Sequence, residues 1–155
     1  MTPPPPEPHP ERAAFLAHLL RLMGVPYIYG GRNTNGVDCW GLIALAYKEA
    51  GGSVRLIAWW TDVAWNTLGK LDSEAELQPG DLAFYGGAGP KDVAHVMVCL
   101  SNGLVMGASG GDSTTKTIPE ALRVGAKVKV FESLTAYNKQ RGDFRGFRRL
   151  AFRGE

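Results

Sequence analysis

The side chain best suited to nucleophilic chemistry in this chain of 155 residues is that of Cys39. It follows the glycine-rich segment 30–36 and begins an apolar stretch, 39–50, whose spacing predicts a buried helix. A helix N-terminus carries partial positive charge, which stabilises a thiolate, and its unpaired amides can bind an oxyanion. Cys39 is therefore the candidate nucleophile; the alternative is a small buried side chain without a chemical role. Cys99 is interpreted as a packing residue.

A thiol nucleophile needs a base, and the chain has three histidines. His9 lies in the proline-rich first ten residues, where we expect no rigid positioning, and His18 lies in the middle of a predicted helix. His95 begins a predicted strand after the flexible loop 86–90, a place from which a side chain can face a cleft. Elimination therefore pairs His95 with Cys39.

The elements that must position this pair follow from hydrophobic periodicity. Spacing typical of helices covers residues 11–23, 39–50 and 61–68. Short runs typical of strands follow in the second half, at 82–85, 94–100, 104–109, 128–131 and 144–152. Helices followed by strands predict an α+β fold, with N-terminal helices packed on a five-stranded antiparallel sheet. Residues 1–10, with six prolines, are interpreted as an arm, and residues 11–155 as a single domain.

Composition limits the classes of protein to which the chain can belong. Hydrophobic residues make up 45% and charged residues 21%, and no apolar run is long enough to span a membrane. The net charge of +2 is too small to predict a nucleic-acid partner, and no cysteine pair predicts a metal site. The first residues lack the features of a signal peptide, so we expect synthesis in the cytoplasm. A basic C-terminal run is interpreted as a solvated sheet face, with attraction to an anionic surface as the alternative; its residues are Lys139, Arg141, Arg145, Arg148, Arg149 and Arg153.

Four motifs occur in a fixed order: Pro26-Tyr27-Ile28-Tyr29-Gly30-Gly31, Val37-Asp38-Cys39-Trp40-Gly41-Leu42, Leu77-Gln78-Pro79-Gly80-Asp81-Leu82 and His95-Val96-Met97-Val98. Together they resemble the NlpC/P60 family of papain-like cell-wall cysteine peptidases, from about residue 12 to residue 149. The resemblance implies a papain-like fold and the hydrolysis of stem peptides in bacterial peptidoglycan, between D-glutamate and a diamino acid. It implies no metal and no cofactor.

The resemblance also implies roles for individual residues. Cys39 matches the nucleophile and His95 the general base and acid. Tyr27 matches a tyrosine that lines the site, and core packing is the alternative for it. Asp38 matches an aspartate that binds the free amino terminus of the stem peptide, and helix capping is the alternative or an additional role.

One position departs from the pattern of the family. The polar residue that usually orients the histidine is replaced by Gly107, which has no side chain. Ser109 follows on the same strand face, and Asp112 lies in the turn beyond. We expect a backbone carbonyl near Gly107, a bound water or the Ser109 hydroxyl to hold His95, and we expect a dyad of Cys39 and His95 to suffice.

Three functions are compatible with these observations. The first is a peptidoglycan endopeptidase, as a bacteriophage endolysin or tail-associated lysin, acting on the cell wall in the periplasm or in a virion, with a phage tail or holin system as partner. The second is a non-catalytic structural or adaptor domain of a phage tail on the same fold. The third is an amidase or acyltransferase of related fold; the order of cysteine before histidine favours the peptidase.

Overall fold

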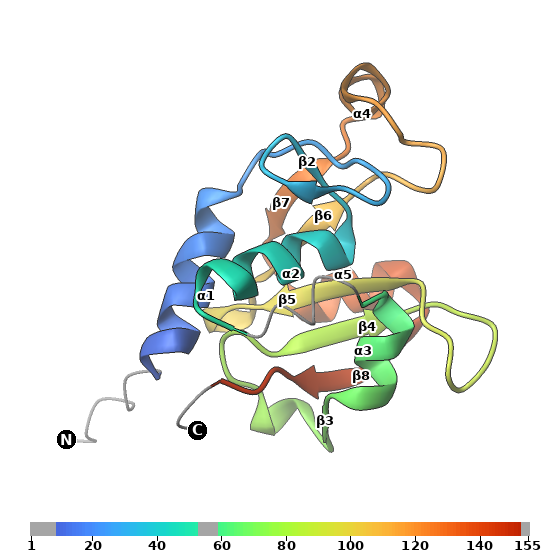
Figure 1. Ribbon diagram of the computed structural model, residues 1–155. Helices are drawn as coiled ribbons and strands as arrows, with labels where there is room; N and C mark the ends of the chain where they lie inside the picture. The colour runs from blue at the N-terminus through green and yellow to red at the C-terminus, as the bar shows by residue number, and fades with distance from the viewer. Residues whose placement is uncertain (1–8, 53–58, 153–155) are drawn as a thin grey trace.

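Helices cover both faces of one antiparallel sheet in the computed structural model, which describes residues 9–52 and 59–152 (Figure 1). The helices in these residues are α1 (Pro10–Arg21), α2 (Cys39–Glu49), α3 (Thr61–Thr67), α4 (Ile118–Val124) and α5 (Leu134–Arg141). Short 3-10 turns lie at η2 (Glu74–Glu76) and η3 (Ser101–Gly103).

The strands form a main sheet and a small hairpin. The main sheet of the described residues has six strands in the order β3-β8-β4-β5-β6-β7, and every neighbouring pair is antiparallel. Its members are β3 (Gly69–Leu71), β4 (Leu82–Tyr85), β5 (His95–Cys99), β6 (Val105–Ser109), β7 (Lys127–Phe131) and β8 (Phe144–Arg149). The hairpin pairs β1 (Arg32–Asn33) with β2 (Gly36–Val37) inside the glycine-rich segment.

The α+β class is confirmed, but the expected number of strands is wrong by one. The additional strand is β3, which pairs with β8 at the edge of the sheet. Three residues, of which only Leu71 is buried, are too few to show an alternating pattern in the sequence. The helices α4 and α5 were also not expected, whereas α1, α2 and α3 lie within two residues of their predicted bounds.

The start of α1 changes the interpretation of the proline-rich arm. Pro10 is the first helical residue, a position where proline is favoured because its missing N–H has no partner to lose. His9 caps the helix, and its Nδ1 atom accepts a hydrogen bond from the amide of Glu11 at 3.2 Å. These two residues therefore belong to the helix, and residues 1–8 lie outside the described part of the chain.

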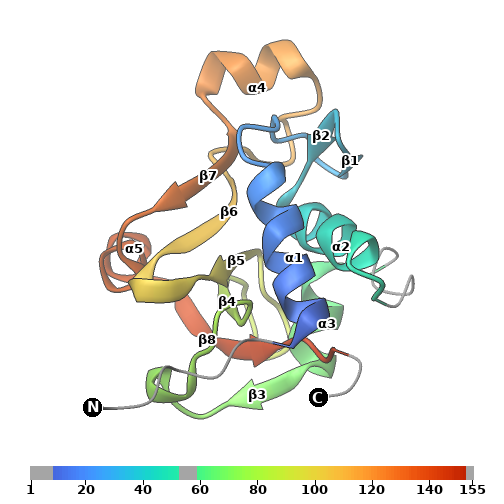
Figure 2. The same ribbon diagram turned by 90° about the vertical axis from the view of Figure 1, so that its left-hand side faces the viewer.

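The two faces of the sheet bury separate clusters of side chains. α1, α2 and α3 pack on one face, against Phe84, Val96 and Val98 among others, and α5 packs on the other, against Tyr85, Met97 and Cys99 (Figure 2). Because side chains alternate along a strand, His95 shares the α5 face with Met97 and Cys99. Cys99 is buried there, at 3% exposure.

The basic C-terminal strand is bound to the rest of the domain rather than freely solvated. Arg149 makes two hydrogen bonds of 2.8 Å to the fully buried carboxylate of Asp81. Arg148 lies over the ring of Trp65, 3.5 Å from its centroid, and Arg145 donates to carbonyls of the 86–92 loop. The expectation of a solvated face is therefore wrong for these arginines, and Arg153 lies outside the described residues.

None of the helices in residues 9–52 and 59–152 is long and apolar enough to cross a membrane. The same residues contain no group of three or more His, Cys, Asp or Glu side chains that could hold a metal ion.

Candidate active site

The N-terminus of α2 is held in place by Asp38. Its Oδ1 atom accepts a hydrogen bond from the amide of Gly41 at 2.6 Å, and its Oδ2 atom accepts one from the amide of Gly30 at 3.0 Å. Gly41 must be glycine, because a Cβ atom there would lie 1.9 Å from the carbonyl oxygen of Gly31. The carboxylate thus ties the glycine-rich segment to the first turn of the helix and sets the position of Cys39.

Asp38→Ala is expected to lower the free energy of unfolding by about 1–3 kcal/mol, because it removes an N-cap and leaves the Gly30 amide without its acceptor. Chemical denaturation measures the loss. Thr117→Ala, at the cap of the exposed helix α4, is the control and should lose no more than about 1 kcal/mol. An Asp38 variant as stable as the native protein would contradict the capping role.

The sulfur of Cys39 lies among hydrogen-bond donors from three elements. The side chain is 8% exposed, and its Sγ atom lies 3.8 Å from Oγ1 of Thr61 at the start of α3. The backbone N–H groups of Val96, in β5, and of Trp40 also interact with the thiol. Pairing between β5 and β6 covers only Val98–Met106 and Cys99–Val105, so the β5 end that contacts Cys39 is paired with β4 but not with β6.

Burial raises the pKa of the Cys39 thiol to about 11, and the negative charge of Asp38 acts in the same direction. The Thr61 hydroxyl and the amides of Val96 and Trp40 oppose this change but do not outweigh it. The lowering of the pKa expected from the helix N-terminus is therefore overcome by desolvation, and the free thiol is neutral at pH 7.

We expect iodoacetamide to alkylate Cys39 slowly at neutral pH, with a rate that rises about tenfold per pH unit toward the pKa of about 11. The thiolate is the reactive form, and its fraction grows in this way at every pH below the pKa. A Cys99→Ala background restricts the signal to Cys39, because Cys99 is the second of the two cysteines in the chain. Burial raises the pKa of Cys99 as well, to about 12. A rate that is already constant between about pH 6 and pH 9 would show a preformed thiolate instead.

His95 is packed between two tyrosines on the α5 face. Its Nε2 atom lies 3.0 Å from the hydroxyl oxygen of Tyr137, and its ring centroid lies 5.7 Å from that of Tyr85. Burial lowers the pKa of His95 to about 3; the positive charge of Arg141 acts in the same direction, and the negative charge of Asp143 opposes it. The imidazole is therefore neutral above about pH 3, which is the form that accepts a proton.

The other ring nitrogen of His95 faces solvent. Among the described residues Nδ1 has no hydrogen-bond partner, and no buried side-chain N or O atom in this part of the chain is left unpaired. An unpaired Nδ1 must therefore be accessible to water. No hydrogen bond joins this ring to the Cys39 sulfur among the described residues, and the two side chains lie on opposite faces of the sheet. The sulfur contacts the backbone of Val96, the residue after His95.

Of the remaining predicted site residues, one lies near the thiol, one contacts Tyr137 and one is bound within its own turn. Tyr27 is buried, and burial together with the charge of Cys39 raises its pKa, so it lies near the thiol. Ser109 interacts with the Tyr137 hydroxyl. Asp112 is bound within its own turn, where it accepts hydrogen bonds from the amide and hydroxyl of Thr114 at 2.8 and 2.6 Å.

Thr61, the Val96 amide and Tyr137 were not found from the sequence. Thr61 and the Val96 amide reach the thiol through contacts between elements that are distant in the sequence, and periodicity does not reveal such contacts. The signal for Tyr137 was indirect: Ser133 and Gly142 bracket a helix as its N-cap and left-handed C-cap, and Tyr137 lies one turn after Leu134 on the buried side.

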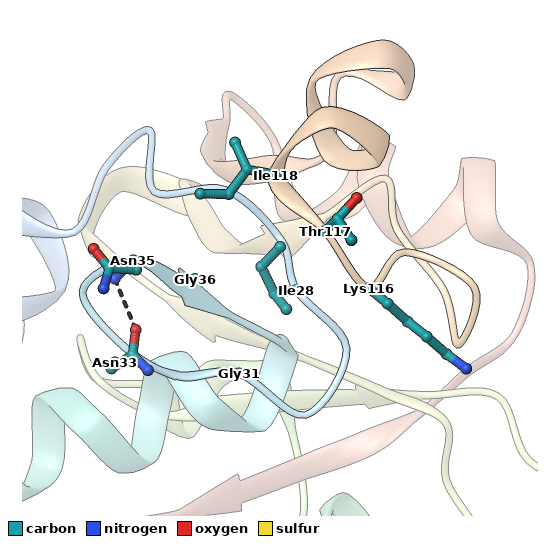
Figure 3. A pocket seen from close by; sticks show the side chains of 8 residues that line it. All are labelled: Ile28, Gly31, Asn33, Asn35, Gly36, Lys116, Thr117 and Ile118. Atoms are coloured by element: carbon teal, nitrogen blue, oxygen red, sulfur yellow. Dashed lines mark hydrogen bonds between the residues drawn. The ribbon is translucent and has the colours of Figure 1, made fainter.

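A cavity of about 320 Å³ opens beside the loop that Asp38 holds (Figure 3). It lies between that loop and residues 116–118, and the side chain of Lys116 points away from it (Figure 3). Its lining residues are Ile28, Gly31, Asn33, Asn35, Gly36, Lys116, Thr117 and Ile118. The volume is in the range of small-molecule sites.

Comparisons with known proteins agree on one family. Residues 24–129 match the model of the NlpC/P60 family. The chain is 36% identical over 110 residues to the peptidoglycan endopeptidase RipB of Mycobacterium tuberculosis, covering 63% of this chain and 43% of that protein. It is 36% identical over 86 residues to the bifunctional muramidase/DL-endopeptidase CwlT of Bacillus subtilis, covering 54% of this chain and 25% of that protein. The chain thus spans less than half the length of these curated relatives.

Solved structures show the same fold. The NlpC/p60 domain of the peptidoglycan hydrolase SagA superimposes with a TM-score of 0.64 at 24% identity, covering 90% of this chain and 98% of that domain.

Proposed function

The chain belongs to the NlpC/P60 family, and from this membership we propose that it is a cysteine peptidase that cleaves stem peptides of bacterial peptidoglycan. The observation that carries the proposal is the position of Cys39. It lies at the first turn of a buried helix, and its sulfur contacts the backbone of Val96, the residue after His95 at the start of β5. The names of the relatives, which include peptidoglycan endopeptidases, support the choice of substrate.

In the acylation step, the Cys39 sulfur attacks the carbonyl carbon of the scissile peptide bond while its proton passes to Nδ1 of His95. Both groups are neutral before the step, so the imidazole acts as a general base and does not merely accompany a preformed thiolate. The hydroxyl of Thr61 and the amide of Val96 stabilise negative charge as it forms on sulfur. In the free protein the ring lies on the α5 face of the sheet and the sulfur on the α2 face, so we infer that the ring moves until Nδ1 reaches the sulfur when substrate binds.

The steps that follow use the same groups. The oxyanion of the tetrahedral intermediate is bound by the backbone amide of Cys39 at the start of α2, because the first N–H groups of a helix have no partner within it. The imidazolium then donates its proton to the leaving amine, and a thioester remains on Cys39. Water, deprotonated by His95, hydrolyses the thioester and restores the free thiol.

The bond cut is proposed to join D-glutamate to a diamino acid. The name DL-endopeptidase carried by CwlT supports this choice. Asp38 is proposed to bind the free amino terminus of the stem peptide in addition to capping α2, because a carboxylate oxygen can accept more than the single hydrogen bond that each makes here. A role as a bacteriophage endolysin or tail-associated lysin is a proposal from the sequence, and lysis on co-expression with a holin would test it.

Digestion of purified sacculi, followed by mass spectrometry of the released fragments, tests the proposal. New amino groups on the diamino acid are expected, since an endopeptidase leaves the stem attached to the glycan. Release of whole stems from N-acetylmuramic acid would identify an amidase. No release from any sacculus would favour the non-catalytic structural domain.

A further inference from the structure

We propose that Tyr137 of α5 is the positioning residue for His95, in place of a polar residue on the strand after it. The hydroxyl oxygen of Tyr137 lies 3.0 Å from Nε2 of His95, within hydrogen-bond distance. This inference rests on the proposed function, because it assigns the orienting group of the same dyad.

The space beside the strand position that would usually carry this group is filled by the Met97 side chain. A Cβ atom on Gly107 would lie 2.4 Å from the sulfur of Met97, so the Met97 side chain occupies the space that a longer residue 107 would need. Met97 is fully buried, and it lies on the same sheet face as His95. The element that packs on this face and reaches the His95 ring is α5, through the Tyr137 hydroxyl.

Tyr137 is itself fixed in a single arrangement. Its side chain is 8% exposed, and its ring packs at 4.8 Å from Phe131 and at 5.3 Å, edge on, from Tyr85. Its hydroxyl also interacts with Ser109 and Arg141. A ring held on two sides and a hydroxyl with further partners give the oxygen a defined position relative to Nε2.

The contact selects the useful tautomer of His95. When the Tyr137 oxygen accepts a hydrogen bond from Nε2–H, the proton of the neutral ring is on Nε2 and the solvent-facing Nδ1 is left free to accept one. When Nδ1 is protonated, the same oxygen still binds Nε2–H of the imidazolium. The hydroxyl therefore serves both states of the base without changing partner.

The other charged and titratable groups around this ring do not replace Tyr137. Tyr85, on β4, donates its hydroxyl to Oδ1 of Asn138 at 2.5 Å. The Arg141 guanidinium is held by Asp143 through bonds of 2.9 and 3.0 Å. Arg141 and Asp143 shift the pKa of His95, but only Tyr137 among the described residues makes a hydrogen bond to its ring.

Tyr137→Phe tests the inference, with Tyr85→Phe as the matched control. Both variants remove one hydroxyl from the same aromatic cluster, and only the first removes the partner of Nε2. We expect Tyr137→Phe to lower kcat for stem-peptide cleavage by about 10- to 100-fold with KM nearly unchanged, as for loss of a hydrogen bond to a charged group. The control should stay within about threefold of native kcat.

A second measurement does not depend on activity. The ¹⁵N chemical shifts of the imidazole rings report their tautomers, and the chain has three histidines to assign. Native protein and Tyr85→Phe should show the Nε2–H form at His95, and Tyr137→Phe a mixture. A native Nδ1–H form, or a Tyr137→Phe variant that matches the control in kcat and tautomer, would overturn the inference. A native protein that cleaves no sacculus overturns the proposed function instead, and the tautomers still decide the role of Tyr137.

Discussion

Cys39→Ala is expected to lower the rate of stem-peptide release from sacculi by about 10³-fold or more, because acylation then has no nucleophile. The chain offers no substitute near the site: the other cysteine, Cys99, is buried on the opposite face of the sheet. The rate of release, followed by chromatography of the soluble fragments, measures the effect. The folded state should persist, since alanine preserves the start of α2 and its Asp38 cap.

Cys99→Ala is the matched control for this experiment. It also removes one buried thiol, on the face covered by α5, and it should retain activity within about threefold once any loss of stability is allowed for. If Cys39→Ala released stem peptides at a rate near that of the native protein, the assignment of a cysteine peptidase would be wrong.

The sequence could predict the parts of the fold that have strong local patterns. The helix 39–49 is apolar on nearly every side, and α1 has a periodic buried face at Phe15 and Leu19, so both were found almost to the residue. α5 was missed because only Leu134 and Tyr137 of its eight residues are buried, which leaves little periodic signal. The available clue was its pair of capping residues, Ser133 and Gly142, and each of these is a signal from one residue only.

The candidate site also has parts that could be predicted from the sequence and parts that could not. Cys39 and His95 could be found because a helix start and a strand start are visible in the sequence and histidines are few. The raised pKa of the thiol could not, since it depends on how completely other elements exclude water from Cys39. Nor could the absence of a side chain at Gly107 show which group replaces it, because His95 and Tyr137 come together only when α5 packs on the folded sheet.

His95→Ala is expected to lower kcat by about 10³-fold, because the neutral thiol of Cys39 then has no base to take its proton. His18→Ala is the control, since His18 lies in α1, on the other face of the sheet from His95, and activity should be unchanged. A His95 variant with nearly native kcat would refute the assignment of the base.

The pH dependence of the variant separates loss of a base from loss of structure. Without His95 only the thiolate can attack, and its fraction rises about tenfold per pH unit up to the Cys39 pKa of about 11. The residual activity of His95→Ala should therefore climb steadily with pH in the alkaline range. The activity of the native protein, whose His95 is neutral above about pH 3, should vary little between about pH 5 and pH 9, because neither Cys39 nor His95 changes charge there. A variant whose residual activity stayed flat with pH would mean that His95 acts on the fold and not on the proton of Cys39.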